Sequence, residues 1–242
     1  MIAAFFDIDG TLYRDSLLIE HFKRLIKYQV IDRNIWSENV RPFFEEWNRR
    51  EGDYEIYLEA LVTSYVKCIK GINIEVIDFI ANQVIEDSWS KIYKFTRNQI
   101  KWHQENDHKV IFISGSPDFL VEKMARHYNV KDASATQYII DKNNKLSGVV
   151  VPMWDSNSKE QKMNYFMEKY GIDMEKSYSY GDTMGDLTML KKVGNPVAFN
   201  PNRKLINAII KDDTLKGRID VVIERKDMCF RVDVENNSIF LD

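Results

Sequence analysis

The chain has 242 residues, of which 44% are hydrophobic and 12% aromatic, and its formal net charge is −3. This composition excludes a disordered chain, and the length allows either one large domain or a core with a smaller lobe. Positive charge is spread along the sequence, so we expect neither nucleic acid nor an anionic membrane as a partner.

The sequence also predicts where the protein resides. Cys68 and Cys229 are far apart and lack metal-type spacing, which favours free thiols in a reducing compartment. Met1 abuts the first predicted strand, leaving no room for a signal peptide. No run approaches the ~18 apolar residues of a membrane helix. We expect a soluble, cytoplasmic protein, and its oligomeric state is not readable.

The first element is an apolar run, residues 2–6, that leads directly into Asp7, Asp9 and Gly10. Such a run predicts a fully buried strand followed by a turn. If the chain leaves the sheet after Asp7, as Gly10 permits, the two carboxylates converge above the strand end, where open α/β sheets bind ligands. Taken alone, the same residues fit an ordinary turn rich in Asp and Gly.

The next stretch, residues 15–92, has helical periodicity and no convincing strand. Its clearest helices are Tyr54–Ile69, with Asp53 as N-cap after a break at Gly52 and with Gly71 at the end, and Ile74–Ile85. We predict a helical cap domain over residues 15–92, inserted into a core of residues 1–14 and 93–242.

From residue 93 onward, strands and helices alternate, which predicts a mainly parallel sheet. The predicted strands are Val110–Ile113, two short strands about Asn143 and Asn144 within Ser134–Val151, Ser177–Tyr180, Val197–Phe199 and Val221–Ile223. The predicted helices are Phe95–Glu105, one with Pro117 in its first turn that runs to Tyr128, Lys159–Tyr170 closed by Gly171, and Asp186–Val193. Alternation of Phe230, Val232 and Val234 predicts an edge hairpin within Met228–Asp242.

Polar residues cluster just after several of these strands. They are Asp7 and Asp9, Ser114, and Asp182 with Asp186, and Lys159 begins a predicted helix. Because parallel strands bring their carboxyl ends to one edge, these groups can meet. Several carboxylates in one place repel unless a cation joins them, and all-oxygen ligands suit Mg²⁺. A lysine, a hydroxyl and the N–H groups beside Gly115 add the parts needed to bind a phosphoryl group.

The same residues resemble the four motifs of the haloacid dehalogenase (HAD) superfamily. The motifs are Asp7-Ile8-Asp9-Gly10-Thr11, Ser114-Gly115, Lys159, and Gly181-Asp182 followed by Asp186. Ser114-Gly115-Ser116-Pro117, the Lys145–Gly148 hairpin and the helical insertion resemble the phosphoserine phosphatase-like branch (subfamily IB). The resemblance implies an α/β, Rossmann-like parallel-sheet core with an inserted α-helical cap of the C1 type.

The resemblance also implies roles for these residues. Asp7 would be a nucleophile that forms an aspartyl-phosphate, and Asp9 would be the general acid and base. Mg²⁺ would be held by Asp7, the backbone carbonyl of Asp9 and Asp182, with Asp186 in or next to that set. Ser114 and the Gly115 N–H would bind phosphoryl oxygens, and Lys159 would neutralise charge. The implied enzyme is a Mg²⁺-dependent phosphatase that hydrolyses a small phosphomonoester.

Several assignments have competing interpretations. Thr11 either caps a turn or binds phosphate. Ser114 either binds a phosphoryl oxygen or simply caps a helix. Lys162, one helical turn on, is the rival of Lys159, and Asp186 could be an acid that favours a helix N-terminus. We interpret the four histidines as ordinary core or surface residues, namely His21, His103, His108 and His127.

Departures from the resemblance concern the substrate. Phosphoserine phosphatases carry a Glu where this chain has Ser16, beside Asp15, and an Arg where it has Leu61, which disfavours phosphoserine. Gly185 replaces the usual Asn, so one supporting hydrogen bond is absent or supplied differently. The presence of Asp9 disfavours dehalogenation. The alternatives are a phosphotransferase with the same intermediate, or a non-catalytic binding protein on this scaffold.

The predicted cap should be mobile and exclude water from the intermediate. Its aromatic residues are interpreted as its own core rather than a substrate cage: Trp36, Phe43, Phe44, Trp47, Tyr54, Tyr57 and Tyr65. Arg14 and Arg41 either meet an anionic substrate or lie on the surface.

Overall fold

The computed structural model describes residues 1–233, and this part of the chain forms one eight-stranded sheet in the order β4-β3-β2-β1-β5-β6-β7-β8. The strands are β1 (Ala3–Phe6), β2 (Lys109–Pro117), β3 (Asp132–Ile140), β4 (Leu146–Val151), β5 (Tyr178–Gly181), β6 (Asn195–Phe199), β7 (Asp220–Arg225) and β8 (Met228–Val232). Pairing is parallel from β3 to β7 and antiparallel at the two edges. The predicted α/β fold is confirmed. The tail contributes the edge strand β8, which pairs with β7, while Val234 and the rest of the predicted hairpin lie outside the described residues.

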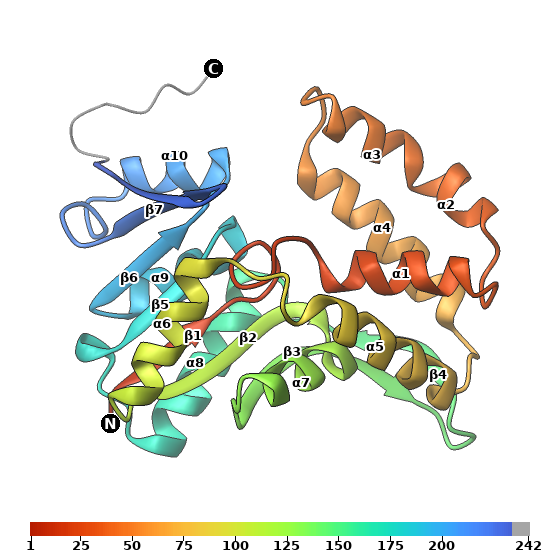
Figure 1. Ribbon diagram of the computed structural model, residues 1–242, viewed down its shortest axis with the longest axis horizontal. Coiled ribbons are helices and arrows are strands. Elements are labelled where there is room, and N and C mark those ends of the chain that lie inside the picture. The colour runs from red at the N-terminus through yellow and green to blue at the C-terminus, as the bar shows by residue number, and fades with distance from the viewer. Residues whose placement is uncertain (234–242) are drawn as a thin grey trace.

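The central strand β1 is buried on both faces, which explains its uninterrupted apolar sequence. Ala4 and Phe6 face a cluster shared with the helices α6 (Lys94–Glu105) and α7 (Asp118–His127). Ala3 and Phe5 face the other way, toward α8 (Ser156–Tyr170) and α9 (Leu187–Lys192). The core is therefore a three-layer arrangement with helices on both faces of the sheet (Figure 1).

Three elements of the core differ from the sequence prediction. Pro117 ends β2 and precedes α7, because the chain stays extended through this residue. Helix α8 begins at Ser156, three residues early, because the Asp155 side chain accepts a hydrogen bond from the Ser158 N–H at 2.9 Å and caps it. Helix α10 (Arg203–Lys211) was not predicted; it packs on β6 and β7.

Five helices lie between β1 and α6, and we call them the helical cap. They are α1 (Leu17–Lys27), α2 (Asn34–Asn39), α3 (Arg41–Asn48), α4 (Tyr54–Ile69) and α5 (Ile74–Ser88). Asp53 caps α4 by accepting from the Glu55 N–H at 2.9 Å, as predicted. The aromatic rings pack on one another, with Trp47 and Tyr57 stacked at 5.5 Å, while Phe43 is exposed.

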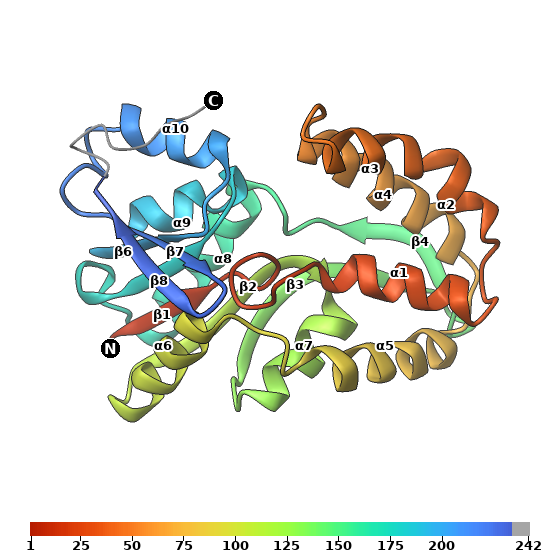
Figure 2. The same cartoon turned by 45° about the horizontal axis from the view of Figure 1, so that its top comes forward.

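The cap contacts the core through the packing of α5 on α7, where Lys123 Nζ lies 2.6 Å from Asp78 Oδ1, and through three further attachments. Its two connections to the core pair with each other. The Arg14 N–H donates to Lys91 O at 3.3 Å, and Tyr13 and Ile92 form an isolated antiparallel β-bridge. The loop between α4 and α5 is hydrogen-bonded to β4, with Gly71 N–H donating to Leu146 O at 2.7 Å. Figure 2 shows β4 reaching from the sheet to the cap.

The third attachment joins α10 to the N-terminus of α4. The Lys204 Nζ lies 2.7 Å from Asp53 Oδ2 and 2.6 Å from Glu55 Oε2. We call these three residues the cap clamp. Among residues 1–233, no helix has the length and apolarity needed to cross a membrane.

Candidate active site

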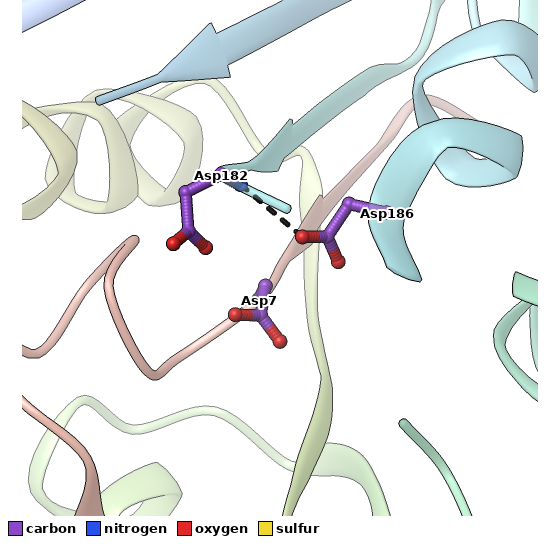
Figure 3. A group of neighbouring side chains, drawn as sticks. All are labelled: Asp7, Asp182 and Asp186. Carbon is purple, nitrogen blue, oxygen red and sulfur yellow. Dashed lines mark hydrogen bonds between the residues drawn. The ribbon is translucent and has the colours of Figure 1, made fainter. Parts of the chain in front are cut away.

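Three carboxylates converge at the carboxyl ends of β1 and β5. Asp7 follows β1, Asp182 follows β5, and Asp186 ends the short 3₁₀ helix η2 (Met184–Asp186). One oxygen from each lies within 4.8 Å of the others, and Figure 3 shows the side chains turned toward one another. Asp7 and Asp182 are 175 residues apart in the sequence, and the parallel sheet brings them together as expected.

Lys159 reaches into this cluster from α8. Its Nζ lies 2.7 Å from Asp7 Oδ1 and 2.6 Å from Asp186 Oδ1, and the residue is only 3% exposed. The Lys162 Nζ instead lies 5.3 Å from the centre of the Tyr165 ring. Of the two lysines that the sequence offered, Lys159 is the one at the carboxylates.

The electrostatics of the cluster show a shortage of positive charge. Burial raises the pKa of Asp7 to about 7, even though Lys159 opposes the shift. Burial and the neighbouring Asp7 raise the pKa of Asp182 well above its ordinary value. Burial alone would lower the pKa of Lys159, but Asp186 and Asp7 raise it above its usual range. The set of oxygen donors therefore suits a hard divalent cation such as Mg²⁺, which would supply the missing charge.

Asp186 supports the loop that carries Asp182. Its Oδ2 accepts hydrogen bonds from the Asp182 N–H at 3.1 Å, the Thr183 N–H at 3.0 Å and the Thr183 hydroxyl at 3.1 Å. Its Oδ1 accepts from Lys159. Both oxygens already have donors, so Asp186 positions the cluster as well as belonging to it.

The turn after β1 packs directly on Asp182. The Thr11 hydroxyl donates to Asp182 Oδ1 at 2.9 Å, a contact that neither of its two sequence interpretations included. Gly10 has φ +79°, and a Cβ atom there would lie 2.2 Å from Asp182 Oδ2. Only glycine allows this conformation and this approach together.

Asp9 lies apart from the three-carboxylate group and has its own donors. Its Oδ2 accepts from the hydroxyls of Ser116 at 2.5 Å and Ser16 at 3.1 Å, and its Oδ1 accepts from the Leu17 N–H at 3.0 Å. Burial raises the pKa of Asp9, while the hydrogen bonds from Ser116, Leu17 and Ser16 oppose that shift.

Ser116 is a site residue that sequence reasoning missed. It follows Ser114 by two residues in β2, and side chains two apart in a strand lie on the same face. This spacing was the available signal. Ser114 itself is fully buried and accepts from the Ser116 N–H at 3.2 Å. It does not cap α7, whose N-cap position is Pro117.

Trp154 lies so close to two glycines of the site, Gly115 and Gly185, that neither position has room for a side chain. A Cβ atom at Gly185 would lie 2.5 Å from the Trp154 carbonyl oxygen, and one at Gly115 would lie 3.0 Å from Trp154 Cβ. An asparagine at position 185 would therefore displace the backbone of Trp154. Thr183, through its bonds to Asp186, supplies hydrogen bonding in this loop.

A family model described as haloacid dehalogenase-like hydrolase matches residues 4–191. This chain belongs to that family. The match covers most of the chain and includes every site residue named above.

Individual relatives of this HAD protein are distant. A probable phosphatase from Mycobacterium tuberculosis is 24% identical over 205 residues, covering 84% of this chain and 70% of the relative. Phosphoserine phosphatase from Methanocaldococcus jannaschii is 22% identical over 213 residues, covering 88% and 93%. A substrate-bound phosphoserine phosphatase structure superposes with a TM-score of 0.64 at 22% identity, covering 93% and 94%. At this identity, the structural likeness establishes the fold alone.

The residues that the sequence offered for substrate recognition are buried or have partners within the chain. Leu61 is fully buried in the cap, and the Ser16 hydroxyl is directed to Asp9. Arg14 and Arg41 have carboxylate partners, at 3.5 Å from Glu224 and 2.6 Å from Glu45 respectively.

Tyr54, the first residue of α4, lies in the electric field of the core carboxylates. Burial raises its pKa, and the charges of Asp9 and Asp182 add to the shift. Its ring lies 5.4 Å from that of Trp47. Tyr54 also follows Asp53 and precedes Glu55, so the cap clamp holds it on both sides.

Proposed function

We propose that this protein is a Mg²⁺-dependent phosphatase that hydrolyses a small phosphomonoester through an aspartyl-phosphate. The observation that carries the proposal is the contact of Lys159 with Asp7 inside a group of three carboxylates. A buried ammonium beside a nucleophilic carboxylate matches the charge that develops when a phosphoryl group arrives.

In the proposed first step, Asp7 attacks phosphorus in line with the ester oxygen. A bond forms between an Asp7 oxygen and phosphorus, the ester bond breaks, and the leaving oxygen takes a proton from Asp9. In the second step, Asp9 takes a proton from water, the water oxygen bonds to phosphorus, and the bond to Asp7 breaks. Inorganic phosphate and an alcohol leave, and Asp9 is again protonated.

The other residues bind and orient. We propose that the Ser114 hydroxyl and the Gly115 N–H bind phosphoryl oxygens and that Thr11 positions Asp182. Asp7, Asp182 and the backbone carbonyl of Asp9 would hold Mg²⁺, with Asp186 adjoining. The ion supplies charge neutralisation for the phosphoryl oxygens when bound.

The cap determines access and selectivity in this proposal. Residues 15–92 form the cap domain, and the charges of Asp9 and Asp182 act on Tyr54 at the α4 N-terminus. Because Leu61 provides no charge, an alcohol with a carboxylate, such as phosphoserine, would lack a partner. The preferred substrate is therefore a small phosphorylated metabolite other than phosphoserine. The free thiols of Cys68 and Cys229 favour a reducing compartment, and we assign the reaction to the cytoplasm.

The proposal is tested by phosphate release from a panel of phosphomonoesters that includes phosphoserine, with Mg²⁺ or EDTA. We expect Mg²⁺-dependent turnover that Asp7→Asn abolishes and that the exposed control Asp213→Asn retains. Added acceptor alcohols distinguish the alternative: a phosphotransferase would yield new phosphate esters in place of free phosphate. Turnover that survives Asp7→Asn would exclude the nucleophile assignment, and absence of turnover on every ester would favour a binding protein.

A further inference from the structure

A pocket lies where the two connections between cap and core run together. Its volume is about 470 Å³, and we call it the hinge pocket. One wall comes from Arg14 on the first connection, and another from Ser90, Lys91 and Ile92 on the second. The start of α6 and the β7–β8 hairpin complete it. None of the lining residues belongs to the carboxylate site described above.

The hinge pocket is strongly cationic in a chain whose net charge is −3. Two of its lining residues are acidic, Glu224 and Asp227, and five are basic, namely Arg14, Lys91, Lys94, Arg97 and Lys226. The lining therefore carries a formal charge of +3.

Glu224 is already engaged at the base of the pocket. It is 8% exposed, and its carboxylate accepts from the Lys94 N–H at 3.0 Å and the Phe95 N–H at 2.8 Å. The Arg14 guanidinium lies 3.5 Å from it. The carboxylate thus serves the N-terminus of α6 and Arg14, and it forms no ion pair with the other basic lining residues.

The remaining four cations have no such partner. Within residues 1–233, no carboxylate lies within 4 Å of the side-chain nitrogens of the other basic lining residues, which are Lys91, Lys94, Arg97 and Lys226. Like charges gathered around a hollow repel one another, and a multiply charged anion would relieve that repulsion. Lysine offers compact charges and arginine a bidentate fork, both of which suit phosphate groups.

We propose that the hinge pocket binds a small polyphosphorylated anion. Several uncompensated cations favour a ligand with at least two phosphate groups over a monophosphate. Because Arg14 and Lys91 belong to different connections, a ligand that contacts both would join them from outside. The pocket is therefore an effector site that restricts the motion of the cap relative to the core.

The experiment measures binding of phosphate, pyrophosphate and tripolyphosphate by calorimetry, in EDTA and at about 0.15 M salt, where surface attraction is largely screened. EDTA leaves the active-site carboxylates without a cation, so they repel these probes. We expect affinity to increase from phosphate to tripolyphosphate, and citrate distinguishes a general polyanion site from one for phosphates. Binding of citrate as tight as that of tripolyphosphate would overturn the phosphate assignment.

Charge reversal locates the binding. Arg97→Glu combined with Lys226→Glu should weaken tripolyphosphate binding at least about tenfold. The control combines Lys131→Glu with Lys142→Glu, two exposed lysines outside the pocket, and should bind as the unmodified protein does. Equal affinity in the pocket variant and the control, or no binding by the unmodified protein, would overturn the proposal. These outcomes are independent of phosphatase activity, since no turnover is measured.

Discussion

The Ser116 hydroxyl donates a 2.5 Å hydrogen bond to Asp9 Oδ2, across 107 residues of sequence. Ser16 donates to the same oxygen from the start of α1. Asp9 is therefore oriented jointly by a core strand and by the first residues of the cap connection. A carboxyl group that must transfer a proton in a defined direction benefits from such fixed donors.

Ser116→Ala tests that orientation. The substitution removes one of three donors to Asp9, and loss of a hydrogen bond to a charged group costs about 1.5–3 kcal/mol. We expect kcat to fall about tenfold or more, with KM changed little, since the phosphoryl contacts remain. Ser158→Ala, which removes a hydroxyl at the start of α8 that bonds to Asp155 and not to Asp9, is the control. An unchanged kcat would show that Ser116 does not position Asp9.

Lys159→Met tests the buried ammonium. The methionine keeps most of the volume but leaves Asp7 and Asp186 without their shared cation. We expect phosphate release to fall at least about a hundredfold, and the free energy of unfolding without metal to fall by about 3 kcal/mol. Denaturant unfolding measures the second quantity. Lys162→Met is the matched control on the same helix, and a comparable loss in that variant would contradict the assignment.

The response to Mg²⁺ should depend on pH. The pKa of Asp7 is about 7 in the folded chain and about 3.9 unfolded, so the folded state binds more protons between these values. In the metal-free protein, the contribution of Asp7 to the free energy of unfolding therefore falls as pH rises from about 4 to about 7. Mg²⁺ binds the ionised form, so the metal has less competition from protons at higher pH.

We therefore expect saturating Mg²⁺ to raise Tm by several degrees more at pH 8 than at pH 5.5, measured by thermal unfolding. Burial lowers the pKa of His21 to about 4 and that of His103 to about 3, which weakens folding in acid. Comparison with and without Mg²⁺ at one pH cancels that effect. Asp182→Asn should remove most of the increment, and equal increments at both pH values would contradict the coupling.

Lys204→Ala tests the cap clamp. The substitution removes the contacts at 2.7 and 2.6 Å that join α10 to the residues on either side of Tyr54. Because the lysine is almost half exposed, we expect unfolding free energy to change by less than about 1 kcal/mol. We expect kcat/KM to fall about threefold, mainly through KM, in steady-state assays of phosphate release. Lys211→Ala on the same helix is the control, and no difference between the two variants would show that the clamp is only a surface contact.

The sheet and the strand-end acids could be predicted because their signals are local. An apolar run ended by Asp and Gly predicts β1 and its turn, and Gly181 with Asp182 does the same for β5. Helix α10 was missed although Leu205, Ile206 and Ile209 have helical spacing and Asn202 accepts from the Leu205 N–H at 2.9 Å. That signal was present in the sequence.

Other features could not be predicted because they depend on how distant elements meet. The clamp joins Lys204 to Asp53, which is 151 residues away, and the sequence does not specify how the cap lies on the core. The role of Gly185 follows only from the position of the Trp154 carbonyl. The contact of Thr11 with Asp182 likewise required the turn geometry after β1.

The hydrogen bonding of the α4–α5 loop to β4 has a consequence for how substrates arrive. Gly71 and Ile72 exchange backbone hydrogen bonds with Leu146, which fixes that side of the cap to the sheet. The opposite side is held by the side chain of Lys204. Because an exposed ion pair is weaker than paired backbone hydrogen bonds, we expect opening of the cap to begin at the side that Lys204 holds. We therefore expect the alcohol part of a phosphate ester to enter and leave next to α10, so that the residues there limit its size.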